Sequence, residues 1–362
     1  MDSAKTLGPI DLDHPTSYAP LDPAGMAAMV SNFPAQCRDA MAIGDSFIPP
    51  AKYKKIEDVL VCGLGGSAIA GDLVGSLNVF RISVPFRVSR QYELPAWTKE
   101  NTLVIFSSYS GNTEETLSSF QQALNRKAKI ICITSGGKLA QFANENKIPM
   151  MTIPGGFPPR AATGYLIFPL LMALEKCGII PSLEDERRET LAVLEAMSAE
   201  LSPSKPALEN DAKTLAKLLL GKLAFIYGAC YLAPVALRWQ TQLNENSKVL
   251  AHAGELPEMN HNEVVAWSHR SQIADKLAAI FLRTKDEHPR VSARFDLTKR
   301  IISENAIVKE YWCKGQSRLA RQMSLVYLGD FASLYLAFLA HKDPMEITAI
   351  NFLKGELAKI SQ

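Results

Sequence analysis

Two short segments of the sequence combine glycines and hydroxyl side chains in a way that suits anion binding. Residues 63–67 read Gly-Leu-Gly-Gly-Ser, and residues 107–113 read Ser-Ser-Tyr-Ser-Gly-Asn-Thr. Glycines let a backbone turn tightly and expose its N–H groups, and the N-terminus of a following helix favours negative charge. The sequence therefore predicts a phosphate site in which the ligands include Gly66, Ser67, Ser108, Ser110 and Thr113.

A simpler explanation exists for any one of these hydroxyls. Asn112 or Thr113 could cap the helix that follows, with an acidic residue in its first turn. For a single serine or threonine we consider the cap the better interpretation. The second segment, however, places four hydroxyls within seven residues. Opposite another Gly-Ser loop, such a cluster favours an anion site.

The glycine-rich segment also has a loose likeness to a dinucleotide-binding turn. Its glycines, Gly63, Gly65 and Gly66, lack the further glycine of that fingerprint. About twenty residues on, positions 84–87 read Val-Pro-Phe-Arg and provide no acidic residue for a ribose. A nicotinamide enzyme is therefore the weaker interpretation, and we expect no cofactor.

Both segments follow predicted strands of an α/β fold. Short apolar runs alternate with helical stretches of ten to fifteen residues, which indicates crossover connections and a parallel sheet. Strands are predicted at 59–62, 86–88, 102–106, 129–133 and 150–153, with helices at 67–77, 114–126, 138–146, 161–176 and 184–198. Ligands of such sheets lie beyond the carboxyl ends of the strands, where both segments fall.

The second half repeats this strand-glycine-helix outline. Strands are predicted at 223–227, 278–282 and 306–311, and helices at 211–220, 233–244 and 319–341. The sequence Ser-Pro-Ser-Lys-Pro at 202–206 is the predicted linker. We therefore expect an arm over 1–55 and two domains, 56–205 and 206–362, each a parallel sheet between helical layers. Within the arm, only a short helix near 26–33 is predicted.

The composition excludes several classes of protein. In 362 residues, 47% are hydrophobic, and 39 Lys and Arg balance 37 Asp and Glu, so neither nucleic acid nor an anionic membrane is an expected partner. Six scattered cysteines form no metal-binding spacing and favour reduced thiols in a cytoplasmic protein, with no metal. The longest apolar stretch, 325–339, is interrupted by Asp330 and predicts a buried helix rather than a membrane span.

Residues 108–116 resemble the signature of the sugar isomerase (SIS) domain, which binds phosphorylated sugars. Three further segments, 63–72, 159–165 and 243–248, resemble the bifunctional phosphoglucose/phosphomannose isomerases. The likeness runs from about residue 55 to the C-terminus. It implies two SIS-type domains and an enzyme that interconverts glucose 6-phosphate and mannose 6-phosphate with fructose 6-phosphate through an enediol.

The resemblance also implies roles for four residues. Glu245 matches the family's catalytic base, Arg160 the cation beside the enediolate, and His261 a ring-opening residue donated by the second subunit of a homodimer. Lys354 matches a C-terminal lysine that assists ring opening. Without the resemblance, each of these residues would be read as an ordinary surface or loop residue.

Some choices stay open at the level of sequence. His252 rivals His261 within what we expect to be one site loop, and Lys342 rivals Lys354. The family often has threonine after the Asp-Pro of the C-terminal tail, but Met345 stands there in this chain. The alternative functions are a glucose-6-phosphate-only isomerase and a non-catalytic sugar-phosphate sensor. A sensor would usually carry a DNA-binding domain, and residues 1–55 show no helix-turn-helix pattern.

Overall fold

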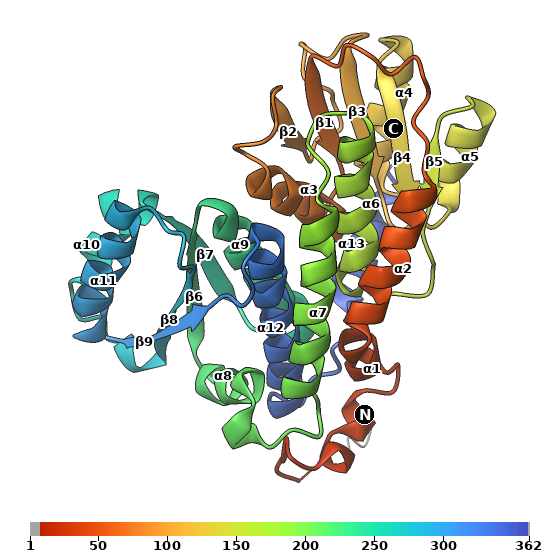
Figure 1. The fold of residues 1–362 in the computed structure, drawn as a ribbon. Coiled ribbons are helices and arrows are strands. Elements are labelled where there is room, and N and C mark those ends of the chain that lie inside the picture. The colour runs from red at the N-terminus through yellow and green to blue at the C-terminus, as the bar shows by residue number, and fades with distance from the viewer. Residues whose placement is uncertain (1–7, 361–362) are drawn as a thin grey trace.

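The computed structural model describes residues 8–360. The N-terminal half contains a five-stranded sheet in the order β2-β1-β3-β4-β5, and every neighbouring pair is parallel (Figure 1). Its strands are β1 (Asp58–Cys62), β2 (Phe86–Ser89), β3 (Thr102–Ser107), β4 (Lys129–Thr134) and β5 (Met150–Thr152). These agree closely with the predicted strands.

Helices cover both faces of this sheet because its strands are apolar on both sides. Val59 and Val61 of β1 belong to the same apolar cluster as α3 (Gly66–Leu77) and α6 (Thr163–Lys176). Leu60 and Cys62 instead join the cluster of α4 (Glu114–Asn125) and α5 (Gly137–Glu145). Buried positions on both faces are the pattern of a parallel sheet in a three-layer αβα unit, which confirms the predicted fold class.

The C-terminal half repeats the arrangement with a four-stranded parallel sheet in the order β7-β6-β8-β9. The strands are β6 (Leu223–Ala229), β7 (Ala251–Leu256), β8 (Leu277–Arg283) and β9 (Ile307–Trp312). One face packs on α8 (Asp211–Leu219), α9 (Ala233–Gln242) and α12 (Arg318–Leu339), and the other on α10 (Glu263–Trp267) and α11 (Pro289–Ser303).

A layer of helices joins the two sheets into one continuous core. It is formed by α2 (Phe33–Ser46), α6, α7 (Glu184–Glu200) and α12, preceded by the short α1 (Met26–Ser31). Among the residues described, α12 is the one helix long and apolar enough to cross a membrane, and 94% of its most apolar window is buried inside the protein. This confirms the predicted buried helix.

Several elements were not predicted from the sequence, among them α10 and the three described next. The first, α2, packs against α6 so closely that a side chain at Gly44 would meet Met172. It lies in the segment expected to be an arm. The second, α11, is a charged helix with only Phe295, Thr298 and Ile302 buried. The third is the edge strand β7, which includes His252 and Gly254, so the expectation that these residues belong to a loop is wrong.

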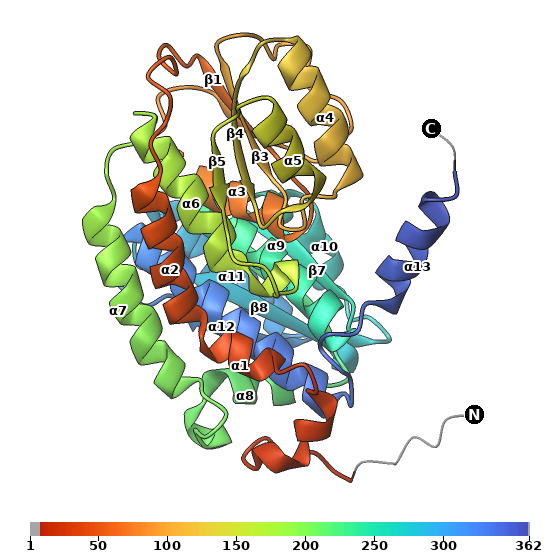
Figure 2. The same cartoon turned by 90° about the vertical axis from the view of Figure 1, so that its right-hand side faces the viewer.

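The last helix stands apart from both domains (Figure 2). None of the residues of α13 (Thr348–Leu357) is buried. Its large apolar side chains Ile350, Phe352, Leu353 and Leu357 are between 37% and 64% exposed. The segment that leads to it, around Pro344, lies against the candidate site described below.

Candidate active site

The two segments predicted to bind an anion meet where β1 and β3 end. The loop after β1 leads into the N-terminus of α3, and the loop after β3 leads into the N-terminus of α4. The Ser67 hydroxyl accepts a hydrogen bond from the backbone N–H of Tyr109 at 3.3 Å, which joins the loops. A side chain at Gly66 would lie 2.9 Å from the carbonyl oxygen of Pro159. The glycine therefore also lets a third segment, 159–161, approach.

The hydroxyls of the second loop do not cap its helix. Thr113 occupies the N-cap of α4, yet its side chain makes no capping hydrogen bond and instead lies 3.0 Å from the Ser108 hydroxyl. The Ser107 hydroxyl is buried and has no hydrogen-bond partner within the described structure. Ser110 is exposed at the loop surface. The simple capping explanation thus accounts for little of this loop, and the anion-site interpretation is favoured.

The loop after β4 holds the second loop in shape. Gly111 has φ +66°, and a side chain there would lie 1.8 Å from the carbonyl oxygen of Gly136. The backbone N–H of Leu139 donates to the Gly111 carbonyl at 2.9 Å, and that of Lys138 donates to the Asn112 side chain at 3.1 Å. Only glycine fits this position, which explains its place in the motif.

Arg160 links the phosphate loops to the second domain. It lies in a short 3-10 helix, η3 (Pro159–Ala161), and is only 4% exposed. Its Nε donates to Asn246 Oδ1 at 2.7 Å, Nη1 to Glu245 Oε2 at 3.3 Å, and Nη2 to the carbonyl oxygen of Pro344 at 2.5 Å. Burial lowers the pKa of Arg160, an effect that Glu245 opposes, but a guanidinium stays protonated in proteins.

Glu245 lies on a widened helical turn. After α9 ends, residues Leu243–Ser247 form one π-helical turn, and Lys248 closes it in the left-handed conformation at φ +57°. Such turns are frequent at functional sites. The Glu245 side chain is 33% exposed, so its carboxylate is held by Arg160 and still accessible. A carboxylate beside a buried cation suits proton abstraction from a carbon whose developing negative charge needs stabilisation.

Lys248 holds this turn against the C-terminal tail. Its Nζ donates to the carbonyl oxygens of Glu245, Asn246 and Asp343 at 2.9, 3.2 and 2.6 Å. Burial lowers the pKa of Lys248, and the nearby Arg160 lowers it further. Lys248 and Asn246 belong to the motif at 243–248, but the sequence predicts no role for either, although the unbroken polar run is a signal.

Within one chain, Glu245 and His261 flank opposite ends of the strand β7. Glu245 precedes β7, whereas His261 follows it, in the 3-10 helix η7 (Glu258–His261). The six residues of β7, each adding about 3.3 Å, put roughly 17 Å of strand between the two. His252 is also outside the site, because it lies within β7 and pairs with Glu263 at 3.1 Å.

Lys354 is likewise not brought to the site by the fold of a single chain. It lies on the exposed helix α13, although the tail segment that precedes this helix contacts Arg160 through Pro344. Its rival Lys342 lies at the end of α12, with its backbone N–H bonded to Ala337. The fold thus assembles the phosphate loops, Arg160 and Glu245, but not His261 or Lys354.

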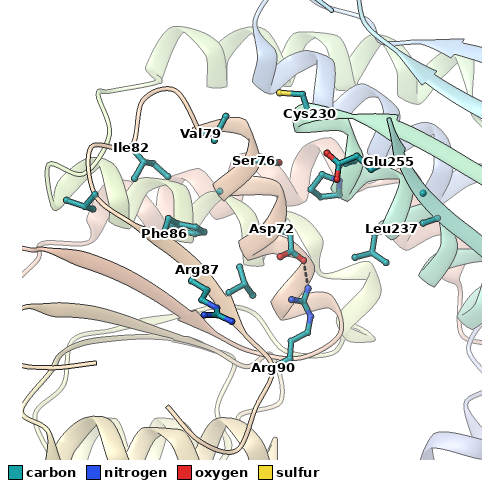
Figure 3. A pocket seen from close by; sticks show the side chains of 17 residues that line it. Asp72, Ser76, Val79, Ile82, Phe86, Arg87, Arg90, Cys230, Leu237 and Glu255 are labelled. Carbon is teal, nitrogen blue, oxygen red and sulfur yellow. Dashed lines mark hydrogen bonds and ion pairs between the residues drawn. The ribbon is translucent and has the colours of Figure 1, made fainter. Parts of the chain in front are cut away.

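A wide cleft between the two domains lies elsewhere. It has a volume of about 850 Å³ and is bounded by α3 and β2 on one side and by α9 and β7 on the other (Figure 3). An Asp72–Arg90 ion pair, Arg87 and Glu255 lie among mostly apolar side chains. Among the residues described, its lining includes none of those predicted for catalysis or phosphate binding, so we place the site by its chemistry.

Comparisons with known proteins agree with this arrangement. Residues 52–155 match the SIS domain family, and residues 208–357 match the family described as "Bacterial phospho-glucose isomerase C-terminal SIS domain". A glucose-6-phosphate isomerase-like protein from Thermus thermophilus has a similar fold, with a TM-score of 0.63 at 21% identity, covering 96% of this chain and 99% of that one.

Two curated relatives carry the same description, "Bifunctional phosphoglucose/phosphomannose isomerase". The protein from Caldicellulosiruptor bescii is 42% identical over 92% of this chain and 99% of its own length. The protein from Aquifex aeolicus is 36% identical over 83% of this chain and 90% of its own length.

Two αβα units that match SIS domains, the first with a hydroxyl-rich loop after β3, define an SIS-domain sugar isomerase. The similarity to the curated relatives extends over nearly the whole chain. The chain belongs to the bifunctional phosphoglucose/phosphomannose isomerase family.

Proposed function

We propose that the chain interconverts glucose 6-phosphate and mannose 6-phosphate with fructose 6-phosphate. The observation that carries the proposal is the Arg160–Glu245 pair, 3.3 Å apart, beside the loop that contains Gly66. The phosphate would be held by Gly66, Ser67, Ser108, Ser110 and Thr113 at the N-termini of α3 and α4. The sugar would then extend from this loop toward Glu245.

The proton transfer requires one base and one stabilising cation. In the open-chain aldose, the Glu245 carboxylate removes the proton on C2, the C1–C2 double bond forms, and the former carbonyl oxygen becomes an enediol oxygen. Arg160 stabilises the negative charge that develops on the oxygens. The hydroxyl proton on O2 then moves to O1, and return of the carbon-bound proton from Glu245 to C1 gives the ketose with its carbonyl at C2. C2 is planar in the enediol, so glucose and mannose 6-phosphate give the same intermediate, and no cofactor is required.

Ring opening requires groups that one chain does not bring together. We infer a homodimer in which His261 of one chain reaches the site of the other, since β7 separates His261 from Glu245 within a chain. Lys354 would join the site when α13 packs in the dimer. The apolar residues of that helix, exposed in the single chain, fit this proposal.

A cytoplasmic location follows from the same metabolic role. All six cysteines are free thiols, and Cys37, Cys62 and Cys132 are buried. Burial raises the pKa of Cys62 to about 12, so this thiol is unreactive at neutral pH. Free thiols are typical of a reducing compartment.

A coupled assay with purified protein tests the proposal. Glucose 6-phosphate and mannose 6-phosphate are each supplied with EDTA present, and fructose 6-phosphate is measured. We expect turnover of both sugars. Turnover of glucose 6-phosphate alone would support the glucose-only isomerase. Binding without turnover would support a sensor, and loss of activity to EDTA would indicate a metal-dependent enzyme.

A further inference from the structure

The turn after β1, which contains Gly63 and Gly65, has a counterpart in the second domain at the end of β6. Strands β1 and β3 lie side by side with Cys62 opposite Phe106, and β6 and β8 lie side by side with Tyr227 opposite Phe281. A glycine comes directly after Cys62 and after Tyr227, as Gly63 at the end of β1 and as Gly228 within β6, and each glycine packs against the residue four positions later. Two positions after that glycine, φ is +52° at Gly65 and +53° at Cys230.

The same register identifies the counterpart of the hydroxyl-rich loop. Phe281 occupies the position in its sheet that Phe106 occupies in the first. Counting on from each phenylalanine, Arg283 matches Ser108, Lys285 matches Ser110, and Asp286 matches Gly111. Two hydroxyl donors have thus been replaced by cations, and a glycine by a carboxylate. The loop after β8 therefore differs from the loop after β3 in these side chains and also in its backbone, because Asp286 does not share the left-handed φ of Gly111.

The carboxylate of Asp286 sits among donors from three segments. Its Oδ1 accepts from the Tyr231 hydroxyl at 2.7 Å and from the Thr284 hydroxyl, and lies 3.0 Å from Nη1 of Arg321. Its Oδ2 accepts from Nε of Arg318 at 3.0 Å. Tyr231 and Thr284 are 2% and 4% exposed, and their hydroxyls are 2.8 Å apart, so they bridge the loops after β6 and β8.

The positive charge of this cluster is greater than the negative charge of the Asp286 carboxylate. Two guanidinium groups, Arg318 and Arg321, face the single carboxylate of Asp286. Glu189 lies near Arg321, but its oxygens accept hydrogen bonds from the backbone N–H groups of Gln316 and Ser317. Hydroxyl donors with two arginines are the groups that bind a phosphate or another tetrahedral oxyanion.

We propose that the second domain retains an anion cradle, formed by Tyr231, Thr284, Arg318 and Arg321, that the Asp286 carboxylate fills from within. The cradle would accept an inorganic phosphate or phosphate monoester if this carboxylate were removed. In the intact protein, Asp286 keeps each chain to one sugar-phosphate site. The proposal concerns the second domain only and does not depend on the catalytic roles assigned above.

Calorimetric titration with inorganic phosphate tests this cradle. To remove phosphate binding by the first domain, Ser110→Ala and Thr113→Ala are combined with Asp286→Ala. The matched control carries Asp275→Ala in the same background, because Asp275 is an exposed aspartate in the same domain. We expect Asp286→Ala to bind phosphate at least tenfold more tightly than the control. Equal affinity in the two proteins would overturn the proposal.

A second variant covers the case in which the alanine variant does not fold. Asp286→Asn keeps an acceptor for Tyr231 and Thr284 but leaves both arginines without a counter-charge. We expect phosphate to raise the melting temperature of Asp286→Asn by more than it raises that of the Asp275→Asn control. An equal rise in both melting temperatures would contradict the proposal that Asp286 acts as an internal anion, because the cradle would then have gained no affinity for phosphate.

Discussion

The backbone carbonyl oxygen of Arg160 accepts a hydrogen bond from Nη2 of Arg238 at 3.0 Å. The same nitrogen donates to both oxygens of Asp330, at 2.8 and 2.7 Å, and Gln242 donates to Asp330 as well at 2.9 Å. Arg238 is 1% exposed and comes from α9, whereas Asp330 comes from the middle of α12. A buried ion pair in the second domain therefore fixes the turn that aims Arg160 at Glu245.

Asp330→Asn is predicted to impair both stability and catalysis. The amide removes the charge that compensates the buried Arg238, and breaking such pairs costs about 3–5 kcal/mol of unfolding free energy. Because Arg160 would shift, we also expect kcat to fall about tenfold with little change in KM. Urea unfolding and steady-state kinetics measure the two effects, with the exposed Asp275→Asn as control. Lost stability with unchanged kcat would show that Asp330 does not position Arg160.

Combined Ser110→Ala and Thr113→Ala changes are predicted to weaken phosphate recognition. Each lost donor to a charged group is worth about 1.5–3 kcal/mol, so KM for glucose 6-phosphate should rise by at least tenfold. Inhibition by inorganic phosphate should weaken in parallel. Ser118→Ala, on the exposed face of α4, is the control. Unchanged KM and inhibition would remove the phosphate role from this loop.

The sequence predicts the strands that lead into the two candidate phosphate loops because their signals are local. Strands such as β1 and β3 are unbroken apolar runs that end at Gly63 and Ser107, and both faces of the sheet are buried. The edge strand β7 lacks this signal, since its sequence Ala-His-Ala-Gly-Glu-Leu contains no β-branched residue and it pairs on one side only. The sequence therefore predicts a loop at this position.

The network behind Arg160 could not be predicted from the sequence. Arg238 and Asp330 are 92 residues apart, and no local pattern pairs them. The interruption of an apolar run by Asp330 was visible, but it indicates only that a buried carboxylate needs some partner. Likewise, Lys248 became part of the site only when the fold brought Asp343 beside it.

Mixed dimers are predicted to reveal a site shared between two chains. Glu245→Gln and His261→Ala should each abolish turnover alone, while Glu245→Gln still binds fructose 6-phosphate. If His261 acts across the dimer, a heterodimer of the two variants contains one intact site and one doubly defective site. Random mixing should therefore restore about a quarter of the wild-type activity. No recovery, despite verified heterodimers, would place His261 in its own chain's site or outside catalysis.

Lys354→Ala is predicted to lower kcat about tenfold or more, because a proton-transfer group contributes about 10²–10⁴ to rate. Lys342→Ala should stay near wild type and serves as the control. Leu353→Glu places a charge beside Lys354 on the exposed apolar helix α13 and should reduce both kcat and dimer content, measured by light scattering. Wild-type kcat in Lys354→Ala would exclude this lysine from ring opening.

Asp286 is predicted to contribute stability that disappears in acid. Burial alone would raise its pKa, but hydrogen bonds from Thr284, Tyr231 and Arg318 lower it from 3.8 to about 2. A carboxyl with a lowered pKa in the folded protein stabilises the fold above its unfolded pKa and loses this effect as pH falls toward the folded value. The shift corresponds to about 2 kcal/mol, of which about 1 kcal/mol should be lost by about pH 3. Urea unfolding should show the gap between wild type and Asp286→Asn narrowing by that amount between about pH 5 and pH 3. A constant gap would mean that the carboxylate does not carry the charge on which the cradle depends.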